Sequence, residues 1–421
     1  MSVSLQARFV FPVDRPPIEH GVVMIEGERI VEVGSHRAEG NVLDLGDVAL
    51  LPGLVNAHTH LEFSHLRKPL GQPGIAIVDW IRLIIAERAR ADKWRAEPVY
   101  LGQQESLAAG VTTVGDIVTN PGATCITGID ATFFQEVIGF SRARAESSLN
   151  VLIERLEFTA AAHTAADFAP PTQGISPHAP YTVSPLLLRP LVTLAHRHKM
   201  PVAMHLAESR EELQFLREGN GAFQELLAER SMWDAEAVPR GSTPHDYLRT
   251  LVDAPRALVI HGNYLDDDEL DFLGTHRDRM SLVYCPRTHA YFKNERYPLA
   301  TARKLNVRIA LGTDSRASNP DLSLLSEMRY VAAAYPTVDP NEVLRMGTLA
   351  GAEALGREHD IGSLAPGKLA NIVAVPLRDA NTKSPNGALE GMLADDSPMN
   401  SVWLHAVRTR SGSLPSLDVH L

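Results

Sequence analysis

Two histidines near the start of the chain, His58 and His60, have the residue type and the spacing of metal ligands. They follow the apolar run 51–57, which is typical of a buried strand. Side chains two residues apart on a strand point to the same side, so both imidazoles would leave one strand end together. Histidine is the commonest protein ligand for zinc and similar ions. The pair therefore predicts part of a metal site.

This spacing is not sufficient on its own, because His196 and His198 repeat it. The second pair continues a helical pattern among basic residues, and we interpret it as solvent-exposed surface. The first pair differs in its context, because three further apolar runs also end in polar residues that can act in catalysis. These residues are His205 with Glu208, then His261, then Asp314.

Each of these residues alone would more often be structural, for example a buried histidine bonded to the backbone or an aspartate that caps a helix. Their joint pattern matches barrel enzymes, whose catalytic groups lie at the carboxyl ends of several different strands. Strand-like runs recur throughout the chain, and helical periodicity separates most of them. The runs are a first one that ends at His60, then 111–117, 133–140, 173–180, 201–208, 257–265, 281–287 and 307–315. This alternation predicts an α/β fold with parallel strands closed into a barrel.

The two ends of the chain show a different pattern, with short β-type segments separated by glycine and proline. We expect residues 53–355 to form a distorted (β/α)8 TIM barrel. Residues 1–52 and 356–421 are expected to form together one small β-sandwich domain beside it. The length of 421 residues accommodates both, because a barrel of this kind takes about 250.

The composition favours an enzyme that acts on a small-molecule substrate. The formal net charge is −11 and no long basic run offsets it, which argues against nucleic acid or an anionic membrane as a partner. No apolar stretch reaches membrane-spanning length and the amino terminus lacks the pattern of a secretion signal, so we expect a cytoplasmic protein. The two cysteines, Cys125 and Cys285, are too few for a disulfide framework. A homodimer is left open as the oligomeric state.

The motifs LPGLVNAHTH, HLAES, IHG, LGTDS and GSLAPGKLANIVAV together resemble the amidohydrolase superfamily. Within it, the chain is similar to the aminohydrolase branch, which includes cytosine, guanine, S-adenosylhomocysteine and aminodeoxyfutalosine deaminases and the triazine chlorohydrolases. The resemblance covers nearly the whole chain, and none of the motifs identifies the substrate.

The resemblance implies that His58, His60, His205 and Asp314 hold one divalent metal. Zinc is the expected ion, with Fe²⁺ and Mn²⁺ as alternatives. His261 would hydrogen-bond the metal-bound water or the attacked centre. Family members with two metals carry a carboxylated lysine on the fourth strand, and the segment 174–180 contains no lysine. We therefore expect a mononuclear site.

The implied activity is hydrolytic deamination of an amino-substituted heteroaromatic, a nucleoside or base derivative, with aminodeoxyfutalosine-like compounds among the candidates. A metal-bound water would attack the carbon that bears the amino group, Asp314 would accept its proton, and Glu208 would protonate a ring nitrogen before ammonia leaves. A chlorohydrolase or an amide hydrolase that uses the same metal remains an alternative. So does a noncatalytic barrel, although the complete ligand set argues against it.

Five residues are candidates for substrate contacts. Similar enzymes bring a histidine to the substrate from the region of His178, and they grip a ribose or cover a ring from the region of Asp79 and Trp80. Arg287 follows the seventh strand, where it could bind a substrate carboxylate through two hydrogen bonds. Ser315 directly follows Asp314. The structural alternatives are a rim histidine bonded to backbone, a core tryptophan, and an arginine paired with a nearby carboxylate.

Overall fold

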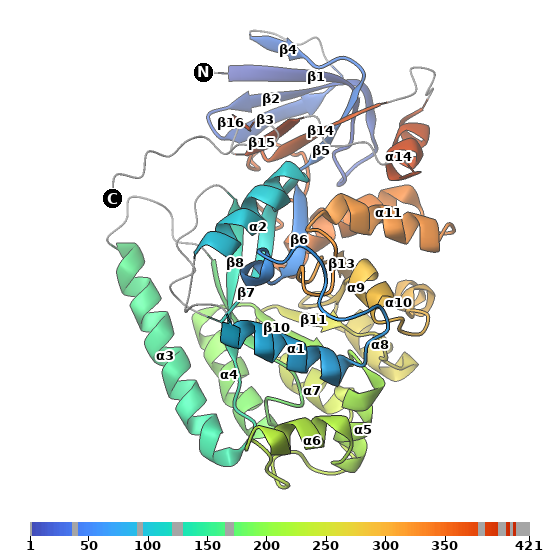
Figure 1. Ribbon diagram of the computed structural model, residues 1–421. Helices are drawn as coiled ribbons and strands as arrows, with labels where there is room; N and C mark the ends of the chain where they lie inside the picture. Colours follow the sequence, from blue (N-terminus) through green and yellow to red (C-terminus); the bar gives the residue numbers. More distant parts are fainter. Residues whose placement is uncertain are drawn as a thin grey trace.

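The computed structural model describes residues 2–35, 41–90, 96–119, 129–164, 172–377, 384–394, 401–404 and 407–409. Within these residues the strands form two separate sheets. One is a barrel of parallel strands with helices around it, and the other is built from both ends of the chain (Figure 1).

The barrel strands follow one another in chain order, and each is hydrogen-bonded to the next in parallel. A parallel bridge between Thr59 and Asp314 links the last strand to the first. This closure confirms the predicted (β/α)8 barrel. The strands are β6 (Leu54–Thr59), β7 (Val111–Val118), β8 (Asp130–Val137), β9 (Thr172–Pro177), β10 (Val202–Leu206), β11 (Ala257–His261), β12 (Met280–Tyr284) and β13 (Ile309–Leu311).

Helices follow most of the barrel strands. The predicted helical periodicity between strands is borne out, for example by Trp80 in α1 and Met328 in α11. A short 3-10 turn, Leu61–Phe63, comes directly after the first histidine pair. The helices are α1 (Ile77–Arg90), α2 (Glu97–Ala108), α3 (Arg142–Thr164), α4 (Pro185–His198), α5 (Arg210–Glu218), α6 (Ala222–Glu229), α7 (Pro244–Leu251), α8 (Asp267–Thr275), α9 (Pro286–Tyr291), α10 (Leu299–Lys304), α11 (Leu324–Ala334), α12 (Pro340–Met346), α13 (Leu349–Ala354) and α14 (Pro385–Ala394).

Strands from the two ends of the chain share the second sheet, as predicted. Figure 1 shows the blue amino-terminal strands and the red carboxyl-terminal strands side by side above the barrel. The two ends meet where β14 pairs antiparallel with β5. The strands are β1 (Ser2–Val10), β2 (Ile18–Glu26), β3 (Arg29–Gly34), β4 (Val42–Asp44), β5 (Val48–Pro52), β14 (Ile372–Pro376), β15 (Ser401–Leu404) and β16 (Val407–Thr409).

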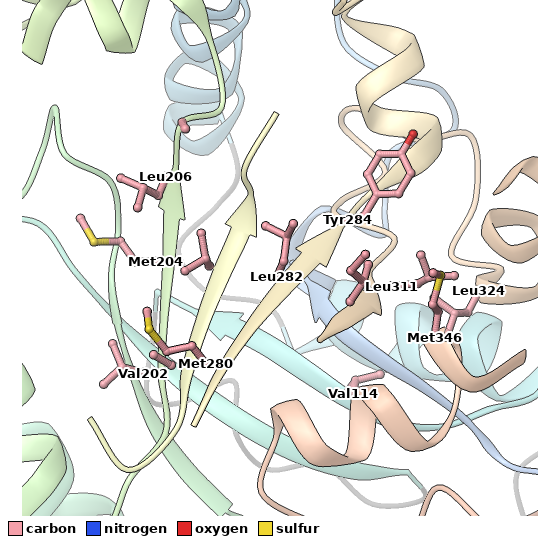
Figure 2. Close-up of a cluster of buried hydrophobic side chains, with 14 of the residues drawn as sticks. Val114, Val202, Met204, Leu206, Met280, Leu282, Tyr284, Leu311, Leu324 and Met346 are labelled. Atoms are coloured by element: carbon pink, nitrogen blue, oxygen red, sulfur yellow. The ribbon is translucent and has the colours of Figure 1, made fainter. Parts of the chain in front are cut away.

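The central barrel strands are buried on both faces, as expected for a parallel sheet covered by helices. Alternate residues form the layer between strands and helices, namely Val202, Met204 and Leu206 of β10 and Met280, Leu282 and Tyr284 of β12 (Figure 2). The residues between them, such as Ala203 and Val283, fill the barrel interior. His205 is two residues beyond Ala203, so strand alternation directs it to the inward side at the end of β10.

Among the described residues, no helix combines the length and the apolar character needed to cross a membrane. Cys285 is buried and free. Cys125 lies outside the described residues. The pair His196 and His198 is exposed at the end of α4, which confirms its interpretation as surface.

Candidate active site

Three imidazoles, those of His58, His60 and His205, converge at the carboxyl ends of β6 and β10. Ring nitrogens of the three residues lie within 4.8 Å of one another, and all three side chains are buried. The ring centroid of His58 lies 4.9 Å from that of His60 and 4.9 Å from that of His205. This spacing suits one cation held by several imidazoles.

Asp314 brings a carboxylate to the same point. Its Oδ1 lies 3.5 Å from Nε2 of His58 and 3.6 Å from Nε2 of His60. Its Oδ2 accepts a hydrogen bond of 2.7 Å from the hydroxyl of Ser318. Imidazole nitrogens and a carboxylate oxygen are the donors that zinc and similar divalent ions take in catalytic sites, so the residues present fit a single metal.

Asp314 meets the histidines because of the way the barrel closes. The N–H groups of Thr313 and Asp314 both donate to the carbonyl of His58, each over 3.1 Å. The Thr59 hydroxyl donates to the Asp314 carbonyl over 2.9 Å, and Asn56 exchanges two hydrogen bonds with Thr313. Ligands more than 250 positions apart in the chain are therefore held together by the junction of the first and last strands.

Burial keeps the clustered histidines neutral. Desolvation lowers the pKa of His58 to about 3. The pKa values of His60 and His205 are also lowered, first by burial and then by the charges that neighbouring histidines would carry. The Nδ1 of His205 lies 2.9 Å from the His178 carbonyl; by donating to it, this nitrogen leaves Nε2 free as a ligand. Neutral imidazole is the form that binds a metal.

His58 carries the clearest sign of an additional ligand. Among the described residues, neither of its buried ring nitrogens has a hydrogen-bond partner. Buried polar groups are almost always paired, so such a group needs an explanation. A cation bound at Nε2, next to the Asp314 carboxylate, would satisfy this nitrogen.

Glu208 and His261 form a second pair beside the first group. Oε1 of Glu208 lies 3.4 Å from Nε2 of His261. Burial raises the pKa of Glu208 well above its usual value, and the charges of Asp314 and Glu212 add to this shift. Burial likewise lowers the pKa of His261. Burial thus disfavours the charged form of both side chains.

Left-handed backbone at three strand ends helps to aim these side chains. Ala207, His261 and Asp314 have φ angles of 53°, 68° and 56°. His261 follows the inward-facing Ile260, and regular strand alternation would turn it away from the interior. Left-handed φ is uncommon for residues with a Cβ, and such backbone is often found at functional sites.

A cavity of about 240 Å³ gives access to this group and is lined by His60, His205, Glu208, His261 and Asp314. Its walls are mostly apolar, with Trp80, Ile81 and Ile84 from α1 and Phe223, Leu226 and Leu227 from α6. Apolar walls with a few converging polar groups are typical of small-molecule sites.

Three of the predicted substrate contacts, Trp80, His178 and Ser315, line this cavity. The Trp80 indole donates to the Ala317 carbonyl over 3.0 Å, so its ring has a fixed orientation. Nδ1 of His178 lies 2.7 Å from the Thr182 hydroxyl.

Asp79 and Arg287 do not line the cavity. Asp79 is mostly exposed and pairs with Arg82 on the same helix. The guanidinium of Arg287 donates to both carboxylate oxygens of Asp321 over 2.6 and 2.9 Å and to Glu327 over 2.6 Å. These bonds occupy its polar face, so the structure supports the alternative of an arginine paired with nearby carboxylates.

Two cavity residues, Arg88 and Glu136, were missed by the sequence analysis. Arg88 donates to Glu62 over 2.6 Å, and its Nη1 lies 3.8 Å from Glu136. Glu136 lies in the middle of the predicted strand 133–140 and one residue before the end of the observed β8, so the only signal available was a charged residue inside an apolar run. Arg88 belongs to the apolar stripe of α1, where a long side chain can bury its stem and present its charge to a cavity.

The barrel and its cavity are those of a hydrolase, and a family model supports this classification. The chain belongs to the amidohydrolase family, whose model matches residues 49–401. A 5-methylthioadenosine/S-adenosylhomocysteine deaminase of Moorella thermoacetica is 28% identical over 401 residues, which covers 90% of this chain and 86% of that protein.

Two solved structures show the same fold. An adenosine deaminase from Xanthomonas campestris with bound zinc has a TM-score of 0.77 at 25% identity, over 99% of this chain and 94% of that one. Helicobacter pylori aminofutalosine deaminase has a TM-score of 0.82 at 21% identity, over 97% of this chain and all of that one (100%).

Proposed function

We propose that this protein is a metal-dependent hydrolytic deaminase of an amino-substituted nucleoside or base. The observation that carries the proposal is the buried Glu208 carboxyl, which lines the same cavity as the histidine and aspartate group and lies 3.4 Å from His261. A hydrolase that expels ammonia from a ring needs a group that delivers a proton to a ring nitrogen. The burial of Glu208, which raises the pKa of its carboxyl, and its position in the cavity support this role.

The metal would be held by His58, His60, His205 and Asp314, and we propose zinc as the ion. A divalent metal in this donor set supplies a Lewis acid that lowers the pKa of water to about 7. Three observations support this assignment. His58 and His60 lie together at one strand end, burial lowers the pKa of the His58 imidazole, and the ring nitrogens of His58 have no partner among the described residues.

The proposal gives each of the chain's own groups one role. Asp314 accepts the proton of the attacking water through its carboxylate. Glu208 donates its proton to the ring nitrogen next to the attacked carbon, and His261 hydrogen-bonds the attacked centre. The apolar wall of α1 and α6 excludes water from the face of the ring, with Trp80 and Phe223 as its aromatic members.

The nucleoside class is supported by the sequence relatives, which are deaminases of 5-methylthioadenosine and S-adenosylhomocysteine. The test is ammonia release by zinc-loaded protein from a panel of adenosine, 5-methylthioadenosine, S-adenosylhomocysteine, aminodeoxyfutalosine, cytosine and guanine. We expect turnover of at least one nucleoside and about one divalent metal per chain by elemental analysis. Two metals per chain would contradict the mononuclear assignment.

The same screen distinguishes a deaminase from a hydrolase of another bond and from a noncatalytic barrel. Chloride release from a chlorotriazine, or cleavage of a cyclic amide, without ammonia release from any amino compound would identify a hydrolase of a different bond. A chain that binds no metal would contradict every catalytic proposal made for this cavity.

A further inference from the structure

Glu212 is a fully buried carboxylate to which neither the ligand set nor the proton transfer assigns a role. It lies in the first turn of α5, directly after the strand end that carries His205 and Glu208. Its Oε1 accepts the N–H of Ala207 over 2.8 Å, and its Oε2 accepts the N–H of Glu208 over 3.0 Å. The carboxylate therefore binds the backbone of the proposed proton donor itself.

This geometry differs from an ordinary helix cap. In a capping box the third helical residue accepts the N–H of the N-cap residue. Here the N-cap is Ser209, and Glu212 reaches past it to the two preceding residues. Two successive N–H groups that point at one carboxylate resemble the backbone concavities that bind anions.

The carbonyl groups of the same two residues are also bonded. The Ala207 carbonyl accepts the N–H of Tyr264 over 3.0 Å, and the Glu208 carbonyl accepts the side-chain amide of Asn263 over 2.9 Å. All four backbone polar atoms of residues 207 and 208 thus have partners. Because Ala207 is left-handed, with φ of 53°, this peptide depends on such contacts to keep its conformation.

We propose that Glu212 and Asn263 are positioning residues that clamp the backbone of Glu208 and thereby aim its carboxyl at the reacting ring. This inference rests on the proposed function. Glu212 fixes the N–H side of the segment and Asn263 fixes the carbonyl side. The backbone from which the Glu208 side chain extends is then fixed, and the carboxyl oxygen Oε1 at its end lies 3.4 Å from Nε2 of His261.

The chain offers a matched control in Glu269. It is also a buried carboxylate at the third position of a helix, and burial raises the pKa of both Glu212 and Glu269 to about 7. Glu269 accepts the N–H groups of Asp266 and His245 over 3.0 and 3.1 Å, in an ordinary capping box at the start of α8. Neither Asp266 nor His245 is proposed to act in catalysis, and neither hydrogen bond involves Glu208.

The experiment is a double-mutant cycle with zinc-loaded protein and 5-methylthioadenosine, or adenosine if that is the better substrate. Glu212→Gln keeps the shape but replaces one acceptor by an amide donor. We expect kcat to fall by up to about 10²-fold, with KM and zinc content nearly unchanged, because misplacement of a reacting group by about 1 Å has effects of this size. Glu269→Gln should keep wild-type kcat.

The cycle separates positioning from stability. In a Glu208→Gln background the proton donor is already absent, so Glu212→Gln should lower kcat no further. An additive loss in the double variant, or an equal loss of kcat in Glu269→Gln, would overturn the inference. Asn263→Ala gives a second route if Glu212→Gln fails to fold, and it should show the same dependence on Glu208.

Failure of the proposed function has a different signature. If Glu208→Gln alone leaves kcat within about twofold, the proton-transfer role is wrong and the clamp has no catalytic meaning. If Glu208→Gln lowers kcat by about 10²–10⁴-fold while Glu212→Gln and Asn263→Ala leave it unchanged, the function stands and the clamp is wrong.

Discussion

At the scale of single residues, Asp314 has two proposed tasks, since it contributes to the metal site and accepts a proton. Asp314→Asn keeps the size of the side chain but removes its charge, so it can no longer accept the proton of the attacking water. We expect turnover to fall by at least about 10²-fold even when zinc is supplied in excess. Ammonia release at saturating zinc, with metal content determined in parallel, checks this expectation.

A variant that retains activity within a factor of about two would contradict the assignment of Asp314 as the proton acceptor. The hydrogen bond from Ser318 to Oδ2 provides a comparison. Ser318→Ala removes one bond to the carboxylate but leaves its charge, so its effect on turnover should be clearly smaller than that of Asp314→Asn.

Arg287 is a predicted substrate contact that pairs with carboxylates of the chain itself in the structure. Its side chain is 15% exposed and is bonded to Asp321 and to the fully buried Glu327. Arg287→Met would leave the Glu327 carboxylate buried without its cation. Breaking a buried pair in this way costs about 3–5 kcal/mol, so we expect a marked loss of unfolding free energy. Denaturant unfolding measures it.

The matched control is Arg210→Met. Arg210 also donates two hydrogen bonds to one carboxylate, that of Glu295, but both side chains are mostly exposed. Its removal should leave the unfolding free energy nearly unchanged, because exposed ion pairs contribute little to stability. For Arg287→Met, KM should change equally for neutral and carboxylate-bearing substrates. A selective rise in KM for the carboxylate would restore the substrate-binding role.

At the scale of helices and strands, the sequence predicts which polar residues lie at strand ends. It does not predict which distant side chains those residues pair with. The histidine pair at 58 and 60 and the polar ends at 205, 261 and 314 were predictable, because the apolar strands of a barrel all bring the residues at their carboxyl ends to one face. The partners of Arg287 were not predictable, because Asp321 and Glu327 lie 34 and 40 residues further along the chain.

The helix contribution to the cavity was harder to predict for a physical reason. The periodicity of α1 shows which face is buried, but it does not say whether that face meets a strand or a cavity. Trp80 and Arg88 lie on that face and line the cavity, whereas Asp79 lies on the exposed side. The inward direction of the His261 side chain departs from strand alternation because of one left-handed φ angle. The local sequence gives no sign of this angle.

Helices α8 and α10 pack closely at Gly274. Gly274 lies near the end of α8, and a Cβ at this position would overlap the backbone carbonyl oxygen of Leu305 at the end of α10. Backbone cannot move away as a side chain can. We expect Gly274→Ala to lower the unfolding free energy by about 1–3 kcal/mol, the usual range for overpacking. Thermal or denaturant unfolding measures this loss.

Gly391 in α14 is the matched control, because it is also a helical glycine. Outside the backbone of its own helix, a Cβ there would meet no atom of the described residues within 4 Å. Gly391→Ala should stabilise the protein by about 0.5–1 kcal/mol, since alanine loses less backbone entropy in a helix. Equal destabilisation of the two variants would show that the contact between α8 and α10 is not the cause.

At the scale of the whole molecule, two sheets share the chain, and the barrel lies between the amino- and carboxyl-terminal strands in sequence. The pairing of β14 with β5 joins residues more than 300 positions apart. Strand β6, which carries the first two proposed metal ligands, begins two residues after β5 ends. The small sheet therefore holds the base of the strand that presents His58 and His60.

Buried carboxyls also make the stability of the whole molecule depend on pH. Burial is the main cause that raises the pKa of Glu269 to about 7, whereas an unfolded chain would keep it near its ordinary value of 4.5. The folded state therefore binds this proton more tightly. The resulting stabilisation is fully present below about pH 4.5 and is lost as pH rises through about 7.

The contribution of Glu269 to this pH dependence can be isolated by measuring the unfolding free energy of wild type and Glu269→Gln from pH 5 to pH 8 at constant zinc concentration. Glutamine cannot titrate, so the unfolding free energy of the wild type should fall relative to that of the variant as pH rises. The change should be at most about 3 kcal/mol, because a tenfold difference in proton affinity between the folded and unfolded states corresponds to roughly 1.4 kcal/mol. Protonation of the buried histidines clustered near Asp314 occurs in both proteins and cancels in the comparison. A difference between the two proteins that is independent of pH would mean that Glu269 is ionised throughout this range, and that its two backbone hydrogen bonds outweigh the cost of burial.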